Sequence, residues 1–142
     1  MWGYWTPQER LYRSSSCCVY ALSNRKDTQD FACVVKVITI LGQGEQAERR
    51  LADARQEISA LVRLRDCAQV VTVYDDACFP IQEDGETVGW DVLLRMERLD
   101  CVAELLREGE PLPPSEVETL AADITTALAA AHRAGLIHRD VK

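Results

Sequence analysis

Short runs rich in β-branched residues predict strands in the first forty positions of the chain. Residues 17–22 (CCVYAL) form one such run, and residues 31–40 (FACVVKVITI) form a longer one. The polar stretch NRKDTQD between them is typical of a turn. Residues 1–10 are aromatic and irregular, and we assign them to an N-terminal leader that packs on the following sheet. From residue 11 onward the pattern therefore predicts an antiparallel meander.

A helical period follows the predicted meander. Apolar residues recur at steps of three and four between positions 47 and 62, which draws one apolar stripe along a helix. Residues 70–75 (VVTVYD) then predict a strand, EDGET predicts a turn at Gly85, and residues 90–96 (WDVLLRM) predict another strand. The order of three strands, one helix and two strands indicates an α+β fold. The apolar stripe of the helix consists of Ala47, Leu51, Ala54, Ile58, Leu61 and Val62.

After Leu99 the pattern of apolar and polar residues predicts helices and no longer strands. Residues 102–109 predict a short helix, and PLPP then breaks the chain. Ser115 and Glu118 have the spacing of a capping box, and we expect them to open a long helix that ends near Arg133. That helix is apolar over most of its circumference, which is typical of a helix inside a core. Because little of the chain is left to cover it, we expect the sequence to be the front part of a longer domain.

Lys36 is the first candidate for chemistry, because it interrupts an apolar, β-branched run. Taken alone, it is explained by an outward-facing lysine on an amphipathic strand. The functional alternative is a cation held for a phosphate, which needs an acidic partner nearby. Glu57, on the predicted helix, is the candidate partner, although taken alone it would be an ordinary solvated carboxylate.

The stretch HRDVK, residues 138–142, is the second candidate. An aspartate led by His-Arg and followed two positions later by lysine suits the transfer of a phosphoryl group to a hydroxyl. Asp140 would accept or orient the hydroxyl proton, and Lys142 would offset the charge on the moving phosphate. The alternative is a charged loop in which Arg139 and Asp140 form a surface ion pair that contributes little.

Composition narrows the classes of function. The 142-residue chain has a formal net charge of −7, which argues against a nucleic-acid partner or an anionic membrane. No apolar run is long enough to span a bilayer, and no secretory signal is visible. None of the six cysteines belongs to a C-x-x-C pair. We therefore assign no metal ligand in the chain and expect buried or half-buried thiols in a reducing cytosol.

The order of four features along the chain resembles that of protein serine/threonine kinases of the eukaryotic-like (Hanks) type, bacterial members especially. These features are the V-x-K strand, the helix with a central Glu57, the M-E-x-L segment and HRD-x-K. The resemblance covers nearly the whole chain from about Glu9. It implies an α+β, protein-kinase-like fold, with a five-stranded antiparallel small lobe that carries one long helix. Residues 11–97 would form this nucleotide-binding lobe. Residues 98–142 would form the hinge and the first two helices of the helical large lobe, ending in the catalytic loop.

The resemblance also implies roles for single residues. Lys36 would bind the α- and β-phosphates of ATP and pair with Glu57. Asp140 would be the catalytic base, with Lys142 as its partner. The other implied contacts surround the adenine: Val19 and Val34 sandwich the ring, Met96 lies behind it as the gatekeeper, and the Glu97 carbonyl and the Leu99 N–H face its edge.

The sequence departs from the family pattern at two places. Tyr12, Ser14 and Cys17 stand where the phosphate-binding loop of the family has glycines, so we expect this SSSCC loop to grip phosphates less tightly. The asparagine and the Asp-Phe-Gly segment that hold magnesium in the family would lie beyond Lys142. We therefore expect this chain alone to be inactive or nearly so.

These features predict a protein serine/threonine kinase, present as an N-terminal fragment. The complete enzyme would move the γ-phosphoryl group of ATP, with Mg²⁺, to a Ser or Thr hydroxyl of a protein substrate. We expect a cytoplasmic protein without a nucleic-acid partner; the sequence leaves a downstream membrane anchor open. The alternative hypothesis is a non-catalytic, kinase-like (pseudokinase) module that binds a nucleotide or a protein. A third hypothesis, an unrelated α+β domain, predicts no effect of nucleotides.

Overall fold

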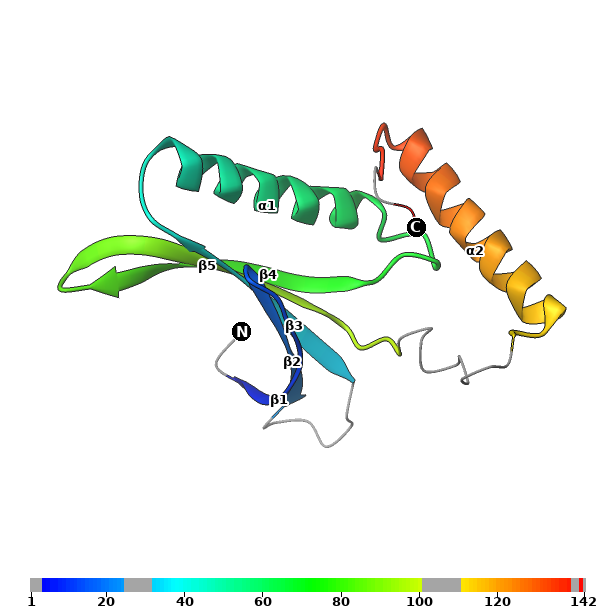
Figure 1. Ribbon diagram of the computed structural model, residues 1–142, viewed down its shortest axis with the longest axis horizontal. Helices are drawn as coiled ribbons and strands as arrows, with labels where there is room; N and C mark the ends of the chain where they lie inside the picture. The colour runs from blue at the N-terminus through cyan, green and yellow to red at the C-terminus, as the bar shows by residue number, and fades with distance from the viewer. Residues whose placement is uncertain (1–3, 25–31, 101–110, 139–140, 142) are drawn as a thin grey trace. The chain divides into compact units, whose positions relative to one another are not determined.

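The computed structural model of the chain describes residues 4–24, 32–100, 111–138 and 141. Five strands and two helices follow one another in these residues (Figure 1). They divide into two compact units, the first made of Met1–Ser59 with Thr72–Arg98 and the second of Ala60–Val71 with Leu99–Lys142. In chain order the elements are β1 (Trp5–Arg13), β2 (Cys17–Asn24), β3 (Cys33–Leu41), α1 (Glu45–Arg63), β4 (Val73–Glu83), β5 (Glu86–Glu97) and α2 (Pro114–Arg133).

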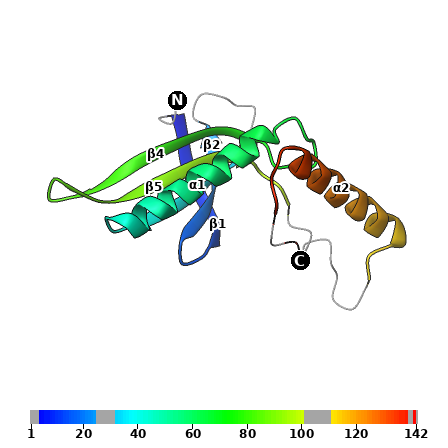
Figure 2. The same ribbon diagram turned by 90° about the horizontal axis from the view of Figure 1, so that it is seen from above.

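The first unit is built on a five-stranded sheet with the strand order β1-β2-β3-β5-β4. Every neighbouring pair of strands is antiparallel. The helix α1 runs along one side of this sheet (Figures 1 and 2). The predicted order of three strands, one helix and two strands is confirmed, and so is the predicted α+β, kinase-like small-lobe fold.

The α1 helix buries the stripe that its period predicts. Ala47, Ala54 and Ile58 are buried, while Val62 at the end of the predicted stripe is 43% exposed. Acidic residues occupy its first turn and a basic residue its last, which suits the helix dipole. In the sheet, Ile40, Val92 and Leu94 have the most deeply buried side chains. Burial of branched apolar side chains at about 25 cal/mol per Å² is the main stabilising contribution to such a core.

The predicted leader is wrong for residues 5–10, because they belong to β1. Trp5 pairs in register with Asn24 of β2 and packs against a buried cluster around Leu22, Cys33 and Val35. These contacts join residues that are far apart in the sequence, so the local pattern of residues 1–10 carries no sign of them. The first strand of the sheet therefore comes from this segment, and its Trp5 side chain is used in packing.

One guanidinium group connects β1 to the other edge of the sheet. The Arg95 guanidinium lies 4.8 Å from the ring centroid of Trp5 and 5.3 Å from that of Tyr74 on β4. Contacts of this kind between a guanidinium and aromatic faces contribute about 0.5–1 kcal/mol each at exposed sites. The buried Nε of Arg95 has no hydrogen-bond partner among the described residues.

The β4–β5 hairpin turns where the sequence predicts, at Gly85. Both turn residues have positive φ, 49° for Asp84 and 84° for Gly85, as a tight two-residue hairpin requires. The predicted strand at residues 70–75 is displaced, because β4 begins at Val73 and continues to Glu83. Pairing with the long strand β5 extends β4 through Cys78, Phe79 and Pro80, where apolar and polar residues do not alternate.

In the second unit, α2 covers the predicted long helix and ends as predicted. The N–H of Gly135 donates to His132 O and the N–H of Leu136 to Ala131 O, while Gly135 has a φ of 72°. This is a Schellman motif, which ends a helix by satisfying its last carbonyls. The predicted capping box is wrong. The helix begins at Pro114, one residue before Ser115, because proline is preorganised for the first helical position, and no side chain caps it.

Two further predictions concern residues that the structure does not describe. The short helix predicted at residues 102–109 lies outside the described residues, as does most of the polar turn after Asn24. In the part of the chain that is described, neither helix has the length and apolar character needed to cross a membrane.

Apolar residues of α2 are exposed in this chain. Val117 and Ile124 are each 50% exposed, and Leu120 and Leu128 are half-buried. We expect the isolated 142-residue chain to bind an environment-sensitive apolar dye, because exposed apolar surface of this kind associates with such ligands. Ile124→Gln should lower the dye fluorescence, whereas Glu118→Gln on the same helix should leave it unchanged. Equal fluorescence of both variants would contradict the assignment of the dye site to α2.

Candidate functional site

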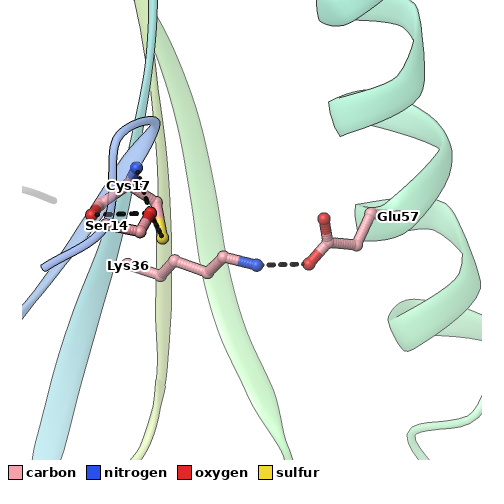
Figure 3. A network of polar contacts seen from close by, with 4 residues as sticks. All are labelled: Ser14, Cys17, Lys36 and Glu57. Carbon is pink, nitrogen blue, oxygen red and sulfur yellow. Dashed lines mark hydrogen bonds and ion pairs between the residues drawn. The ribbon is translucent and has the colours of Figure 1, made fainter. Parts of the chain in front are cut away.

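Lys36 and Glu57 are brought together by the fold of the first unit. Lys36 lies in the middle of β3, where it pairs in register with Val19 of β2 and Leu94 of β5. Glu57 comes from α1, next to the buried Ile58 that holds this turn of the helix on the sheet. The Lys36 Nζ atom donates a hydrogen bond of 2.5 Å to Glu57 Oε1 (Figure 3).

This ion pair contributes little to the stability of the fold. The Lys36 side chain is 25% exposed and that of Glu57 is 47% exposed, so water screens their attraction. Exposed pairs of this kind stabilise proteins by about 0–1 kcal/mol. The pair instead fixes the direction of the Lys36 ammonium group, which stays accessible to an anionic ligand. A lysine oriented by a carboxylate is suited to hold a phosphate group.

The predicted adenine contacts occupy the same face of the sheet as Lys36. Val34 precedes Lys36 by two residues on β3, and it pairs with Met96 of β5. Val19 of β2 pairs with Lys36 itself. Because side chains alternate between the two faces of a sheet, these four residues share one face. Val34 is 7% exposed, and Val19 and Met96 are half-buried.

Glu97 ends β5 in a fixed position. Its N–H donates to Thr72 O at 3.0 Å, and its Oε1 accepts from the Thr72 N–H at 2.7 Å. The next residue, Arg98, donates its N–H to Ala32 O at 2.9 Å. Leu99, the other predicted hinge residue, belongs to the second unit and is 63% exposed. No local pattern predicts the contact with Thr72, which couples the end of β5 to the segment before β4.

The Tyr74 hydroxyl is the group whose titration is perturbed in this region. Burial raises the pKa of Tyr74, and the nearby Cys33 and Glu97 raise it further, while Arg95 partly offsets them. A neutral hydroxyl is therefore maintained beside Glu97 through the physiological range.

The turn that stands where the family has a glycine-rich loop is closed by the side chain of one of its own residues, Ser14. Tyr12 lies in β1 and is 57% exposed, Ser14 lies in the turn, and Cys17 begins β2. The Ser14 Oγ atom accepts hydrogen bonds from the N–H groups of Cys17 at 3.1 Å and Ser16 at 3.3 Å. Serine hydroxyls commonly accept hydrogen bonds from backbone N–H groups two or three residues ahead. The serine at position 14 was therefore a sequence signal for this hydrogen-bonded turn.

Asp140 and Lys142 lie outside the described residues, so their predicted catalytic roles stay predictions. The adjoining His138 and Val141 are described and are exposed. Among the residues with a described position, no three His, Cys, Asp or Glu side chains gather closely enough to hold a metal ion.

Comparison with known proteins agrees with this arrangement. Residues 6–142 match the protein kinase domain family. The chain is 40% identical over 97 residues to the serine/threonine-protein kinase PknL of Mycobacterium tuberculosis, an alignment that covers 67% of this chain and 22% of PknL. It is 36% identical over 73 residues to a probable serine/threonine-protein kinase of Corynebacterium efficiens, covering 51% of this chain and 11% of that protein.

The family match and the geometry concern the same residues. The matched range contains the sheet except for Trp5, the helix α1, and the pair between Lys36 and Glu57. The aligned part of the chain spans about a fifth of the length of PknL and about a tenth of the C. efficiens protein. The chain belongs to the protein kinase family.

Proposed function

We propose that this chain is the nucleotide-binding part of a protein serine/threonine kinase that transfers the γ-phosphoryl group of ATP to protein hydroxyls. The observation that carries the proposal is the hydrogen bond from Lys36 to Glu57 on the face of the sheet that also holds Val19, Val34 and Met96. The names of the aligned relatives support the serine/threonine class. We propose the cytoplasm as the compartment, since ATP is available and thiols stay reduced there.

In this proposal one group of residues binds ATP, and a second group acts on the phosphoryl group during its transfer. Lys36, oriented by Glu57, places its charge on the α- and β-phosphates. Val19 and Val34 hold the adenine ring between them, Met96 closes the rear of the site, and the Glu97 carbonyl and Leu99 N–H bind the edge of the ring. Asp140 orients the hydroxyl of the protein substrate and accepts its proton, and Lys142 offsets charge on the moving phosphoryl group.

Magnesium would supply the remaining neutralisation of phosphate charge when bound. The sequence contains no Asp-Phe-Gly segment, which in protein kinases carries a magnesium ligand. Positioning and charge neutralisation account for most of the catalysis of phosphoryl transfer. We therefore propose that a polypeptide of these 142 residues binds ATP but transfers its phosphoryl group very slowly or not at all.

Lys36→Met tests the proposed phosphate contact. Methionine keeps an unbranched apolar stem close in length to that of lysine but removes the charge, so the sheet should be preserved. We expect the affinity of the chain for ATP to fall about tenfold, the loss of one charge-assisted hydrogen bond of roughly 1.5 kcal/mol. Isothermal titration calorimetry measures this loss directly.

Adenosine provides the control for this substitution, because it has the ring but no phosphate. Its affinity should be the same in the wild-type chain and in Lys36→Met. An unchanged affinity for ATP in the variant would refute the phosphate-binding role of Lys36. A fall in the affinity for adenosine as well would show damage to the sheet and not the loss of a phosphate contact.

A non-catalytic, kinase-like binding module is the second candidate, favoured by the turn at Ser14. Its N–H groups already have partners in the chain itself. The two candidates differ in the activity of the full-length protein with ATP, Mg²⁺ and a generic protein substrate. Phosphate incorporation that disappears with Asp140→Asn supports the kinase, whereas nucleotide binding without any incorporation supports the module.

A further inference from the structure

The turn between β1 and β2 is closed by a single hydroxyl group. The Ser14 Oγ atom lies 3.1 Å from the Cys17 nitrogen and 3.3 Å from the Ser16 nitrogen, and accepts a hydrogen bond from each. It also lies 3.4 Å from the carbonyl oxygen and 3.4 Å from the sulfur of Cys17 (Figure 3). The Ser14 N–H donates to the same Cys17 carbonyl at 2.8 Å, which closes the hairpin.

This closed turn is a relaxed conformation of the backbone. In the described part of the chain, Asp84 is the one residue other than glycine with a positive φ, so the serines of the turn have ordinary dihedral angles. The Thr39 N–H of β3 donates to Ser16 O at 3.2 Å, which attaches the turn to the sheet. The turn therefore needs no glycine and no ligand to keep its shape.

The turn leads into β2, whose first residue shares a face of the sheet with Lys36. Cys17 precedes Val19 by two residues, and Val19 is the register partner of Lys36, so Cys17 and Lys36 are on one face. Figure 3 shows the turn beside the Lys36 side chain, with Glu57 approaching from α1. A turn in this place binds phosphates only through backbone N–H groups that point at the ligand without another partner.

We propose that Ser14 determines how strongly this site prefers a nucleotide with phosphates over the bare nucleoside. Its hydroxyl oxygen occupies the N–H groups of Ser16 and Cys17, which leaves Lys36 as the main phosphate contact. The site then discriminates weakly between ATP and adenosine. This inference rests on the proposed nucleotide-binding function and adds a specificity-determining residue to it.

Ser14→Ala tests the proposal, because it removes the acceptor and leaves the Ser14 backbone bond to Cys17 in place. Titration calorimetry with ATP and with adenosine is carried out on the whole 142-residue chain. We expect ATP to bind about three- to tenfold more tightly to the variant, as expected for one or two N–H groups released to the phosphates. The affinity for adenosine should not change.

Ser15→Ala is the matched control, since Ser15 is exposed in the same turn and takes no part in these hydrogen bonds. It should bind ATP and adenosine like the wild-type chain. Amide hydrogen exchange gives a readout that needs no nucleotide. The Ser16 and Cys17 amides should exchange faster in Ser14→Ala than in Ser15→Ala, while the amides of β3 should be unaffected.

The outcomes separate this inference from the function on which it rests. Equal or weaker binding of ATP by Ser14→Ala, with adenosine binding retained, overturns the role of Ser14 and leaves the nucleotide site standing. Unchanged exchange at Ser16 and Cys17 in a folded Ser14→Ala variant also overturns it. Failure of every variant to bind either ATP or adenosine overturns both proposals.

Discussion

Replacing Gly89 by alanine is expected to lower the free energy of unfolding by about 2–3 kcal/mol, a large part of the stability of a domain of this size. Gly89 is buried in β5, between Leu41 of β3 and Ile81 of β4. A Cβ atom at this position would lie 2.4 Å from the Ile40 carbonyl oxygen and 3.2 Å from the Leu41 Cα. Both atoms belong to the backbone of a central strand, so neither can move aside cheaply. Urea unfolding monitored by circular dichroism measures the loss.

Gly85→Ala is the control for this prediction, because it makes the same chemical change without a clash. Nothing lies within 4 Å of a Cβ at Gly85, but its φ of 84° is strained for alanine. We expect a loss of about 1 kcal/mol from this strain. A Gly89→Ala chain as stable as the wild type would show that β3 and β5 are not as close at Gly89 as the structure has them.

Glu57→Gln is expected to lower the rate of phosphoryl transfer by the full-length protein about 10- to 100-fold, under the proposed function. The amide keeps the size of the side chain and a possible hydrogen bond but removes the charge that orients Lys36. The ammonium group is then free to leave the position from which it stabilises the phosphates. Because the pair is partly exposed, the melting temperature should change by no more than about 2 °C.

Asp53→Asn is the matched control for this variant. Asp53 is an exposed carboxylate one turn earlier on α1, and its loss changes the net charge by the same amount. Its steady-state rate should equal that of the wild-type protein. An equal rate in Glu57→Gln would mean that the pair with Lys36 has no part in catalysis. A large fall in melting temperature would instead assign the pair a structural role.

Local patterns predicted those parts of the fold whose interactions are local. The period of α1 identified the residues that it buries, such as Ala54 and Ile58, and β-branched runs located β2 and β3. Glu57 lies on the same predicted helix and was chosen as the acidic partner that Lys36 needs. The pair of Lys36 with Glu57 was inferred from the resemblance, and the fold places the two side chains in contact.

Features that depend on residues distant along the chain could not be predicted from local sequence patterns. The strand β1 looked irregular because its packing partners, such as Cys33 and Arg95, come much later in the chain. The need for glycine at position 89 comes from the backbone of β3, which no local pattern reveals. The start of α2 was missed by two residues, because the predicted N-cap was Ser115 and the observed one is Pro113. Pro114 and Ser115 are both common near helix starts, and the fixed φ of proline prevailed.

The position of Arg95 between Trp5 and Tyr74 has a consequence for the folding of the protein during its synthesis on the ribosome. β1 and β4 are the two edge strands of the sheet, and the guanidinium that contacts an aromatic ring on each is translated about 90 residues after Trp5. At roughly 5–20 residues per second, the N-terminal tryptophan waits about 5–20 s for its partner. During that interval the nascent chain exposes an indole ring and an unfinished sheet edge, which makes this the period in which a chaperone would protect it most.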